Sequence, residues 1–221
     1  MAEDSPAIVT NLEDAIAVIR FNKPAQRNPL SIDTLHDLEK VLSELTVRDD
    51  IKALIFTGTA DVFASGANIR ELQQLAADSA LQFSQLGQRV FQTIADAKQL
   101  TIAAINGYCI GGALDLALAC DIRVASTNAV FAHPGARLGI ITGWGGTQRL
   151  PRIIGRTCAI EFFATAGRYS SAAALEMGLI SRVADPVIEY AGELAGSYQL
   201  TKRRWRITRH LPFLPNKSTN S

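Results

Sequence analysis

The chain of 221 residues has little cysteine and no long hydrophobic run. Its three cysteines, Cys109, Cys120 and Cys158, are odd in number and lie in apolar sequence. We therefore expect reduced core side chains rather than a disulfide framework or a metal site. The longest stretch without a charged residue, 99–114, is broken by glycines and is too short to cross a membrane. These absences argue against a disulfide-stabilised secreted domain and against a membrane span.

Negative charge is absent from the C-terminal tail. Residues 201–221 contain Lys and Arg but no Asp or Glu, so the rest of the chain is net acidic although the whole carries +1. A short basic tail with one aromatic side chain in its charge cluster, Trp205, is weak evidence for nucleic acid, and a solvated terminal helix explains it equally well. The acidic, polar residues 1–6 do not resemble a targeting presequence. We expect a cytoplasmic protein with no nucleic-acid partner.

What is present is the composition of a globular domain, with 48% hydrophobic and 19% charged residues. The hydrophobic pattern predicts strands at residues 8–12, 15–21, 53–57, 101–105 and 122–125. It predicts helices at 32–46, 80–96, 147–154, 157–166 and 171–178, with two more beginning near residues 112 and 187. The order strand, crossover helix, strand is typical of an α/β fold. We expect a core at 1–185 and a shortened helical, basic tail at 186–221.

Two glycine-containing loops follow predicted strands, at residues 64–68 and 110–113. Ligands of parallel α/β sheets bind at such strand ends, and a helix that begins at Gly112 would point unpaired N–H groups outward. If the two loops are adjacent, their N–H groups would converge on one oxygen and form an oxyanion hole. The alternative is that these glycines serve only to make turns.

Three ordered motifs carry a family resemblance. They are AINGYCIGGALDLALACD at 104–121, FASGANIREL at 63–72 and GWGGTQRL at 143–150. From about residue 8 to 183 the chain resembles the crotonase superfamily, the enoyl-CoA hydratase/isomerase family.

The resemblance implies a spiral of ββα units, a helical C-terminal region used in trimer contacts, and an acyl-CoA thioester as substrate, with no separate cofactor. A homo-oligomer, a trimer or dimer of trimers, is implied as well, although the short tail departs from the family pattern. The N–H groups of Ala67 and Gly112 match the family's oxyanion hole. Further matching positions would hold the coenzyme A part of the substrate: Gln26, Arg27, Pro29, Ala64, Ala67, Asn68, Ile69 and Arg70.

The family's acid/base pair is changed in this sequence. Hydratases of the family resemble one another in carrying two glutamates, whereas here Asp115 stands at the first position and Gly135 at the second. A glycine has no group that exchanges protons. Asp115 is either catalytic or a carboxylate favoured by a helix N-terminus. His133 is either a substitute proton carrier or a structural histidine.

Trp144 also departs from the family, which tends to carry a small residue there. Its ring would fill the space of the missing glutamate, wall off an acyl pocket, or simply pack in the core. Naphthoyl-CoA synthases of the superfamily are similarly glycine-like at the second acid position, where bicarbonate can act instead. We thus expect an enzyme of the enoyl-CoA hydratase/isomerase class. The alternatives are a decarboxylase or thioesterase acting on a CoA thioester, and a catalytically weak acyl-CoA-binding protein.

Overall fold

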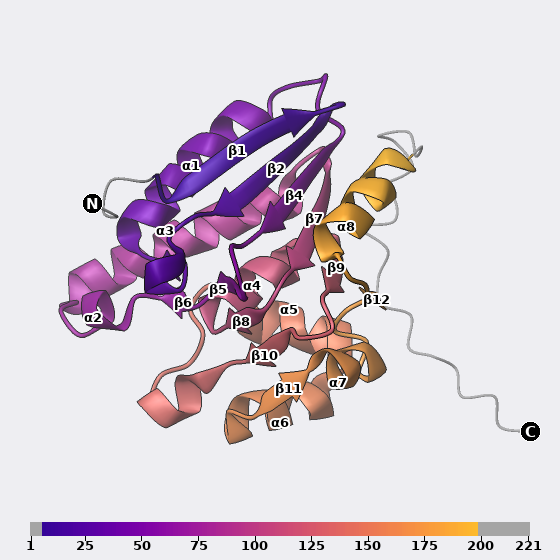
Figure 1. The fold of residues 1–221 in the computed structure, drawn as a ribbon. Helices are drawn as coiled ribbons and strands as arrows, with labels where there is room; N and C mark the ends of the chain where they lie inside the picture. Colours follow the sequence, from indigo (N-terminus) through magenta and orange to yellow (C-terminus); the bar gives the residue numbers. More distant parts are fainter. Residues whose placement is uncertain (1–5, 199–221) are drawn as a thin grey trace, which may run out of the picture.

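A six-stranded sheet forms the centre of the fold (Figure 1) in a computed structural model that describes residues 6–198. Its strands run in the order β1-β2-β4-β7-β9-β12. The bounds are β1 (Ile8–Glu13), β2 (Ile16–Phe21), β4 (Ala53–Thr57), β7 (Leu100–Ile105), β9 (Ile122–Ala125) and β12 (Arg182–Val183). The β1–β2 pair is an antiparallel hairpin, and every other pair in the sheet is parallel. This confirms the predicted α/β class.

Both faces of the large sheet are covered, which explains the continuous apolar runs of its central strands. Leu54 and Phe56 of β4 belong to the larger core cluster, together with helices α1 (Ile32–Leu45), α3 (Ala77–Asp96) and α4 (Gly112–Ala119). Ala53 and Ile55, which alternate with them, face α8 (Val187–Gly196). Helix α8 therefore packs on the opposite face of the sheet from α1, α3 and α4. The division into a core at 1–185 and a tail at 186–221 stays a prediction.

A second sheet of short strands lies at the ends of the first. Its order is β11-β10-β8-β5, with β5 (Val62–Ala64), β8 (Tyr108–Ile110), β10 (Val130–Ala132) and β11 (Arg168–Ser170). Along the chain β5 follows β4, β8 follows β7 and β10 follows β9, and each short strand precedes a helical segment. This repeat is the expected spiral of ββα units. The loop predicted at 64–68 contains the end of β5 and a further strand, β6 (Gly66–Ala67), which pairs with β3 (Pro29–Leu30).

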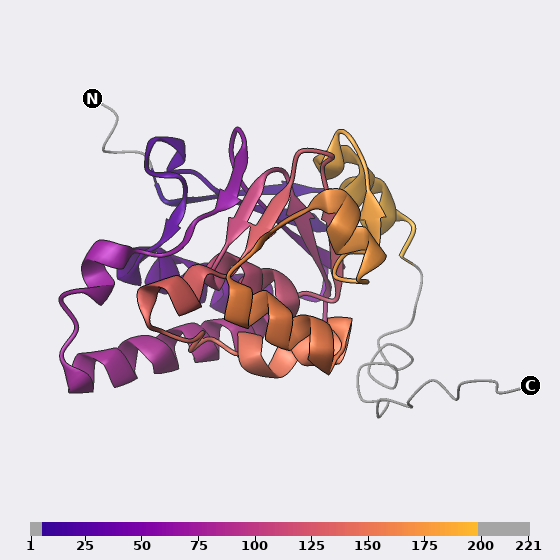
Figure 2. The same ribbon diagram turned by 90° about the horizontal axis from the view of Figure 1, so that it is seen from below.

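The remaining helices complete the core. Figure 2 shows α5 and α6 below the sheet, on the same side as α3. Their bounds are α5 (Gly146–Ile154) and α6 (Arg156–Thr165), and the shorter elements are α2 (Ile69–Leu72), α7 (Ser171–Glu176) and the 3-10 helices η1 (Pro24–Gln26) and η2 (Pro134–Leu138). Helix caps follow the sequence: the side chains of Ser31 and Asn68 accept backbone N–H groups of α1 and α2.

Two further expectations meet the structure. Cys109 and Cys120 are buried as predicted, but Cys158 is exposed on α6, so the expectation that it belongs to the core was wrong. The apolar neighbours of Cys158 in sequence alternate between the two sides of the helix, and the thiol lies on the outer one. The expected continuation of the last helix into the basic tail falls on residues 199–221, which lie outside the described residues. Between residues 6 and 198, no helix has the length and hydrophobicity needed to span a membrane.

Candidate active site

Three short parallel strands end side by side at one place. In the register of the second sheet, Ala64 of β5 pairs with Cys109 of β8, and Ala132 of β10 pairs with Ile110 of β8. The segments that follow these strands, 65–67, 111–112 and 133–135, all contribute to one cavity of about 300 Å³. The carboxyl ends of parallel strands are where α/β folds usually bind ligands.

Gly66 brings two of these segments into close contact. Its φ is +82°, and a methyl group on its Cα would lie 2.5 Å from the carbonyl oxygen of Ile110 and 2.8 Å from the amide nitrogen of Gly112. Only glycine fits both the backbone conformation and the space. The loops at 64–68 and 110–113 are therefore adjacent, which is the condition on which the sequence prediction of an oxyanion hole depends.

Gly111 and Gly112 open helix α4. Gly111 has φ +59° and ψ −124°, a backbone region that is essentially restricted to glycine. Its N–H donates to the carbonyl of Ala132 at 2.9 Å, which ties the helix start to the end of β10. Gly112 is the first residue of α4, so its N–H has no partner within the helix.

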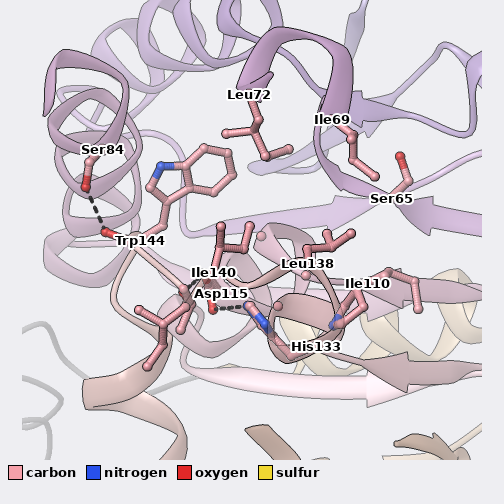
Figure 3. Close-up of a pocket in the computed structure, with 18 of the residues that line it drawn as sticks. Ser65, Ile69, Leu72, Ser84, Ile110, Asp115, His133, Leu138, Ile140 and Trp144 are labelled. Atoms are coloured by element: carbon pink, nitrogen blue, oxygen red, sulfur yellow. Dashed lines mark hydrogen bonds and ion pairs between the residues drawn. The ribbon is translucent and has the colours of Figure 1, made fainter. Parts of the chain in front are cut away.

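The charged group of the cavity is Asp115, in the first turn of α4 and 1% exposed. The hydroxyl of Thr142 donates to its Oδ2 in a short hydrogen bond. Its Oδ1 lies 3.7 Å from Nε2 of His133, and neither of these two atoms has a hydrogen-bond partner among the described residues. Figure 3 shows the two side chains facing each other across this gap. The distance exceeds that of a direct hydrogen bond, so both atoms are left for a third group.

The Asp115 carboxylate also lies at the start of helix α5. A methyl group on Gly146, the first residue of α5, would lie 2.1 Å from Oδ1 of Asp115. The N-terminus of a helix carries partial positive charge. Further along α5, burial lowers the pKa of the Arg149 guanidinium, while the negative charge of Asp115 opposes that change.

His133 lies where the strand β10 gives way to η2. The strand ends at Ala132 and does not continue through Pro134, yet His133 and Gly135 still lie together. A methyl group on Gly135 would lie 3.4 Å from Nδ1 of His133 and 2.6 Å from the carbonyl oxygen of Ile140. The imidazole is 6% exposed and packs edge-on against Phe163 at 5.3 Å between ring centroids. The imidazole and the Ile140 backbone thus occupy the space where a side chain at 135 would begin.

Apolar side chains form most of the remaining cavity wall. Ile69 and Leu72 of α2, Phe83 of α3 and Trp144 line it, and Leu138, Ile140 and Ile141 lie at its exposed edge. No motif in the sequence marks Thr142 or these edge residues as part of the site. Thr142 lies next to the GWGGTQRL motif, but only the fold shows that it reaches Asp115, 27 positions earlier in the chain.

The predicted site residues divide into two groups. Ala67, Ile69, Gly112, Asp115, His133, Gly135 and Trp144 line the cavity, whereas Gln26, Arg27, Pro29, Ala64, Asn68 and Arg70 do not. Ala64 is fully buried in β5. Arg27 is exposed in a left-handed conformation, with its guanidinium 4.8 Å from the ring centroid of Tyr108. Among residues 6–198, no group of three or more His, Cys, Asp or Glu side chains is placed to hold a metal ion.

Residues 11–199 match the sequence profile of the family described as enoyl-CoA hydratase/isomerase. The chain belongs to this family. It is 37% identical over 203 residues to a crotonyl-CoA hydratase of Syntrophomonas wolfei, covering 89% of this chain and 78% of that protein. It is 36% identical over 180 residues to a short-chain-enoyl-CoA hydratase of Clostridium acetobutylicum, covering 81% and 69%.

Solved structures share the fold. An enoyl-CoA hydratase from Bacillus anthracis superimposes with a TM-score of 0.83 at 32% identity, covering 86% of this chain and 76% of that one. DspI of Pseudomonas aeruginosa gives a TM-score of 0.87 at 30% identity, covering 93% and 86%. The family relationship therefore extends over the large sheet, the second sheet and the helices around the cavity.

Proposed function

We propose that this chain is an acyl-CoA enzyme of the enoyl-CoA hydratase/isomerase class that stabilises a thioester enolate and exchanges protons through Asp115 and His133. The observation that carries the proposal is the buried Asp115–His133 pair at the ends of the strands that also present Gly112 and Ala67. Family membership and the named hydratases among its relatives support the substrate class. Coenzyme A enters as part of the substrate, so no separate cofactor is required.

The backbone supplies the electrostatic part of the proposed reaction. The N–H groups of Ala67 and Gly112 would donate to the thioester oxygen, which becomes negative when the enolate forms. Donors that are held in place before reaction need no reorganisation, and one such donor typically contributes about 10²–10³-fold in rate. The closeness of Gly66 to Gly112 supports this arrangement.

The side chains supply the proton transfers. Asp115 is the acceptor: the Thr142 hydroxyl holds its Oδ2, and its Oδ1 has no hydrogen-bond partner among the described residues. In hydration, a water molecule bonds through oxygen to the β-carbon and gives a proton to Asp115, while His133 in its imidazolium form gives a proton to the α-carbon. The enolate electrons form the new C–H bond, and the thioester carbonyl is restored. Proton transfer from Asp115 back to His133 completes the cycle.

Substitution of the two side chains tests this assignment. Asp115→Asn and His133→Gln should each lower kcat for crotonyl-CoA hydration by about 10²–10⁴-fold, the range for general acid/base catalysis. The double variant should be little worse than either single variant if the two residues act as a unit. Full activity of His133→Gln would show that the proton for the α-carbon comes from another group.

Decarboxylation and thioester hydrolysis remain the alternatives within the same site. Decarboxylation generates the enolate without a base, so it would need the backbone donors but not the Asp115–His133 pair. Activity on malonyl-type CoA thioesters that survives Asp115→Asn would favour it. Acyl-CoA binding without turnover of any substrate would favour a binding protein. By relationship to the family we also propose a homo-oligomer, which the molar mass in solution tests.

A further inference from the structure

The Trp144 ring lies in a slot between two helices, each of which contributes a glycine. A methyl group on Gly87 of α3 would lie 2.3 Å from its Nε1, and a methyl group on Gly112 of α4 would lie 2.3 Å from its Cζ3. The ring also contacts those of Phe83 and Phe91, at centroid distances of 5.0 and 5.5 Å. Because Gly112 opens α4 at the candidate oxyanion hole, one edge of the indole stands directly against that donor.

The backbone that carries Trp144 is fixed on both sides. Gln88 Nε2 donates to the carbonyl of Gly143 at 2.7 Å, and Arg149 donates to the carbonyl of Trp144 itself at 3.1 Å. The indole N–H points to the carbonyl of Phe83 at 3.4 Å, and the side chain is only 4% exposed. Figure 3 shows the loop joined to Ser84 of α3 on the side away from Asp115. Both the backbone and the side chain of Trp144 are therefore held in place by neighbouring residues.

A second cavity lies between α3 and α5, next to residues 144 and 145. It measures about 510 Å³ and is lined by polar side chains that include Gln88, Gln92 and Arg149. Trp144 lines both this cavity and the one that holds Asp115. The indole itself fills the slot between Gly87 of α3 and Gly112 of α4.

We propose that Trp144 sets the acyl-chain specificity of this protein: it closes the inner end of the site and restricts the acyl group to a short chain. The inference rests on the proposed function, because it places the thioester carbon beside Gly112. A short acyl group would meet the apolar indole face. A longer chain would have to displace a ring that is held by four neighbours, or turn back toward the exposed edge at Ile140 and Ile141.

The experiment compares wild type with Trp144→Ala on enoyl-CoA substrates of four and ten carbons. Wild type should favour the four-carbon substrate, because each methylene that an apolar pocket cannot hold costs roughly 10–200-fold in kcat/KM. Trp144→Ala empties the slot between α3 and α4, so the ratio of kcat/KM for ten carbons over four should rise at least tenfold. An unchanged ratio, or a wild type that turns over both substrates equally, would overturn the proposal.

Two controls keep the result interpretable. Trp144→Phe retains a ring in the slot and should shift the ratio less than Trp144→Ala, with thermal unfolding used to verify that each variant folds. Calorimetric binding of butyryl-CoA and decanoyl-CoA, which lack the reacting double bond, measures chain-length preference without turnover. Equal affinity of the wild type for butyryl-CoA and decanoyl-CoA would refute the specificity role of Trp144 but leave the proposed function standing. If neither ligand binds, the proposed function fails, and the inference fails with it.

Discussion

The two halves of the candidate site are built by different means. We define the donor side as Gly66, Ala67, Gly111 and Gly112, and the proton side as Asp115, His133, Gly135 and Thr142. On the donor side the geometry is fixed by main chain: positive φ angles, strand pairing and a helix start. On the proton side it depends on side-chain identity, with a buried aspartate held by a threonine opposite a histidine. Gly66 and Gly112 on the donor side should therefore tolerate no added carbon, whereas the chemistry of the proton side should depend on which side chains stand at 115 and 133.

The sharpest test of this difference is Gly66→Ala. The new methyl group would meet the Ile110 carbonyl and the Gly112 nitrogen, so the N–H donors should separate and activity should fall by about 10²–10³-fold. The matched control is Gly178→Ala, which has a similar φ of +76° but no atom within 4 Å of the added carbon. Activity assays and thermal unfolding of both variants separate the effect of backbone strain at a positive φ, which both share, from the effect of the steric collision, which only Gly66→Ala has. Equal losses in both would contradict the special role of the donor side.

Adding the missing glutamate tests the proton side. Gly135→Glu should not increase hydration, because its Cβ would lie 2.6 Å from the Ile140 carbonyl and its carboxylate would compete with His133 for space. Crowding of this kind costs about 1–3 kcal/mol of stability. Gly135→Ala makes the same collision without the carboxylate and should lose a similar free energy in denaturant unfolding. A gain in kcat for Gly135→Glu alone would show that the cavity still accepts the family's second acid.

A smaller effect is expected from Thr142→Val, which keeps the shape of the side chain and removes its hydroxyl. Asp115 Oδ2 would lose its donor, so the carboxylate would be less firmly oriented toward its reaction partner. We expect kcat to fall about 10–100-fold, in line with roughly 1.5–3 kcal/mol for a hydrogen bond to a charged group, while KM changes little. Thr142→Ser restores the donor and should recover most of the rate. A change confined to KM would instead assign Thr142 to substrate binding.

The smallest effect concerns the buried Cys109, with the exposed Cys158 as its control. Burial raises the pKa of the Cys109 thiol well above its usual range, and the charge of Asp115 adds to this. The folded state therefore keeps this proton at alkaline pH where the unfolded chain releases it. Stability should fall as pH rises above about 8.5, by at most about 1.4 kcal/mol per pH unit.

Denaturant unfolding at neutral and alkaline pH measures this slope. Cys109→Ala should reduce it, whereas Cys158→Ala, at an exposed position on α6, should leave it unchanged. An identical slope in both variants would mean that another group carries the pH dependence. The free energy of unfolding at neutral pH also compares the two positions, one buried in β8 before the donor side and one exposed on α6.

The sequence predicts the long elements well and the short ones poorly. Periodicity and a serine cap predict α1 at residues 32–46, where the structure has Ile32–Leu45. The strands β8 and β10 have three residues each, which is too short for any pattern, and they form only because neighbouring strands pair with them. From the sequence, the adjacency of the two glycine loops is only a condition of the oxyanion hole, and the strand pairing in the structure meets it. The contact of Thr142 with Asp115 and the slot around Trp144 could not, because they depend on packing between distant segments.

The hydrogen bond from the Gly111 N–H to the Ala132 carbonyl has a consequence for how such a site can change its chemistry. It couples the residue before the Gly112 donor to the residue before His133 through main chain alone. The backbone position of residue 133 relative to the Gly112 N–H is thus set by main chain, whatever side chain stands at 133. The side chain at position 133 can therefore change during evolution while the N–H group of Gly112 keeps its place.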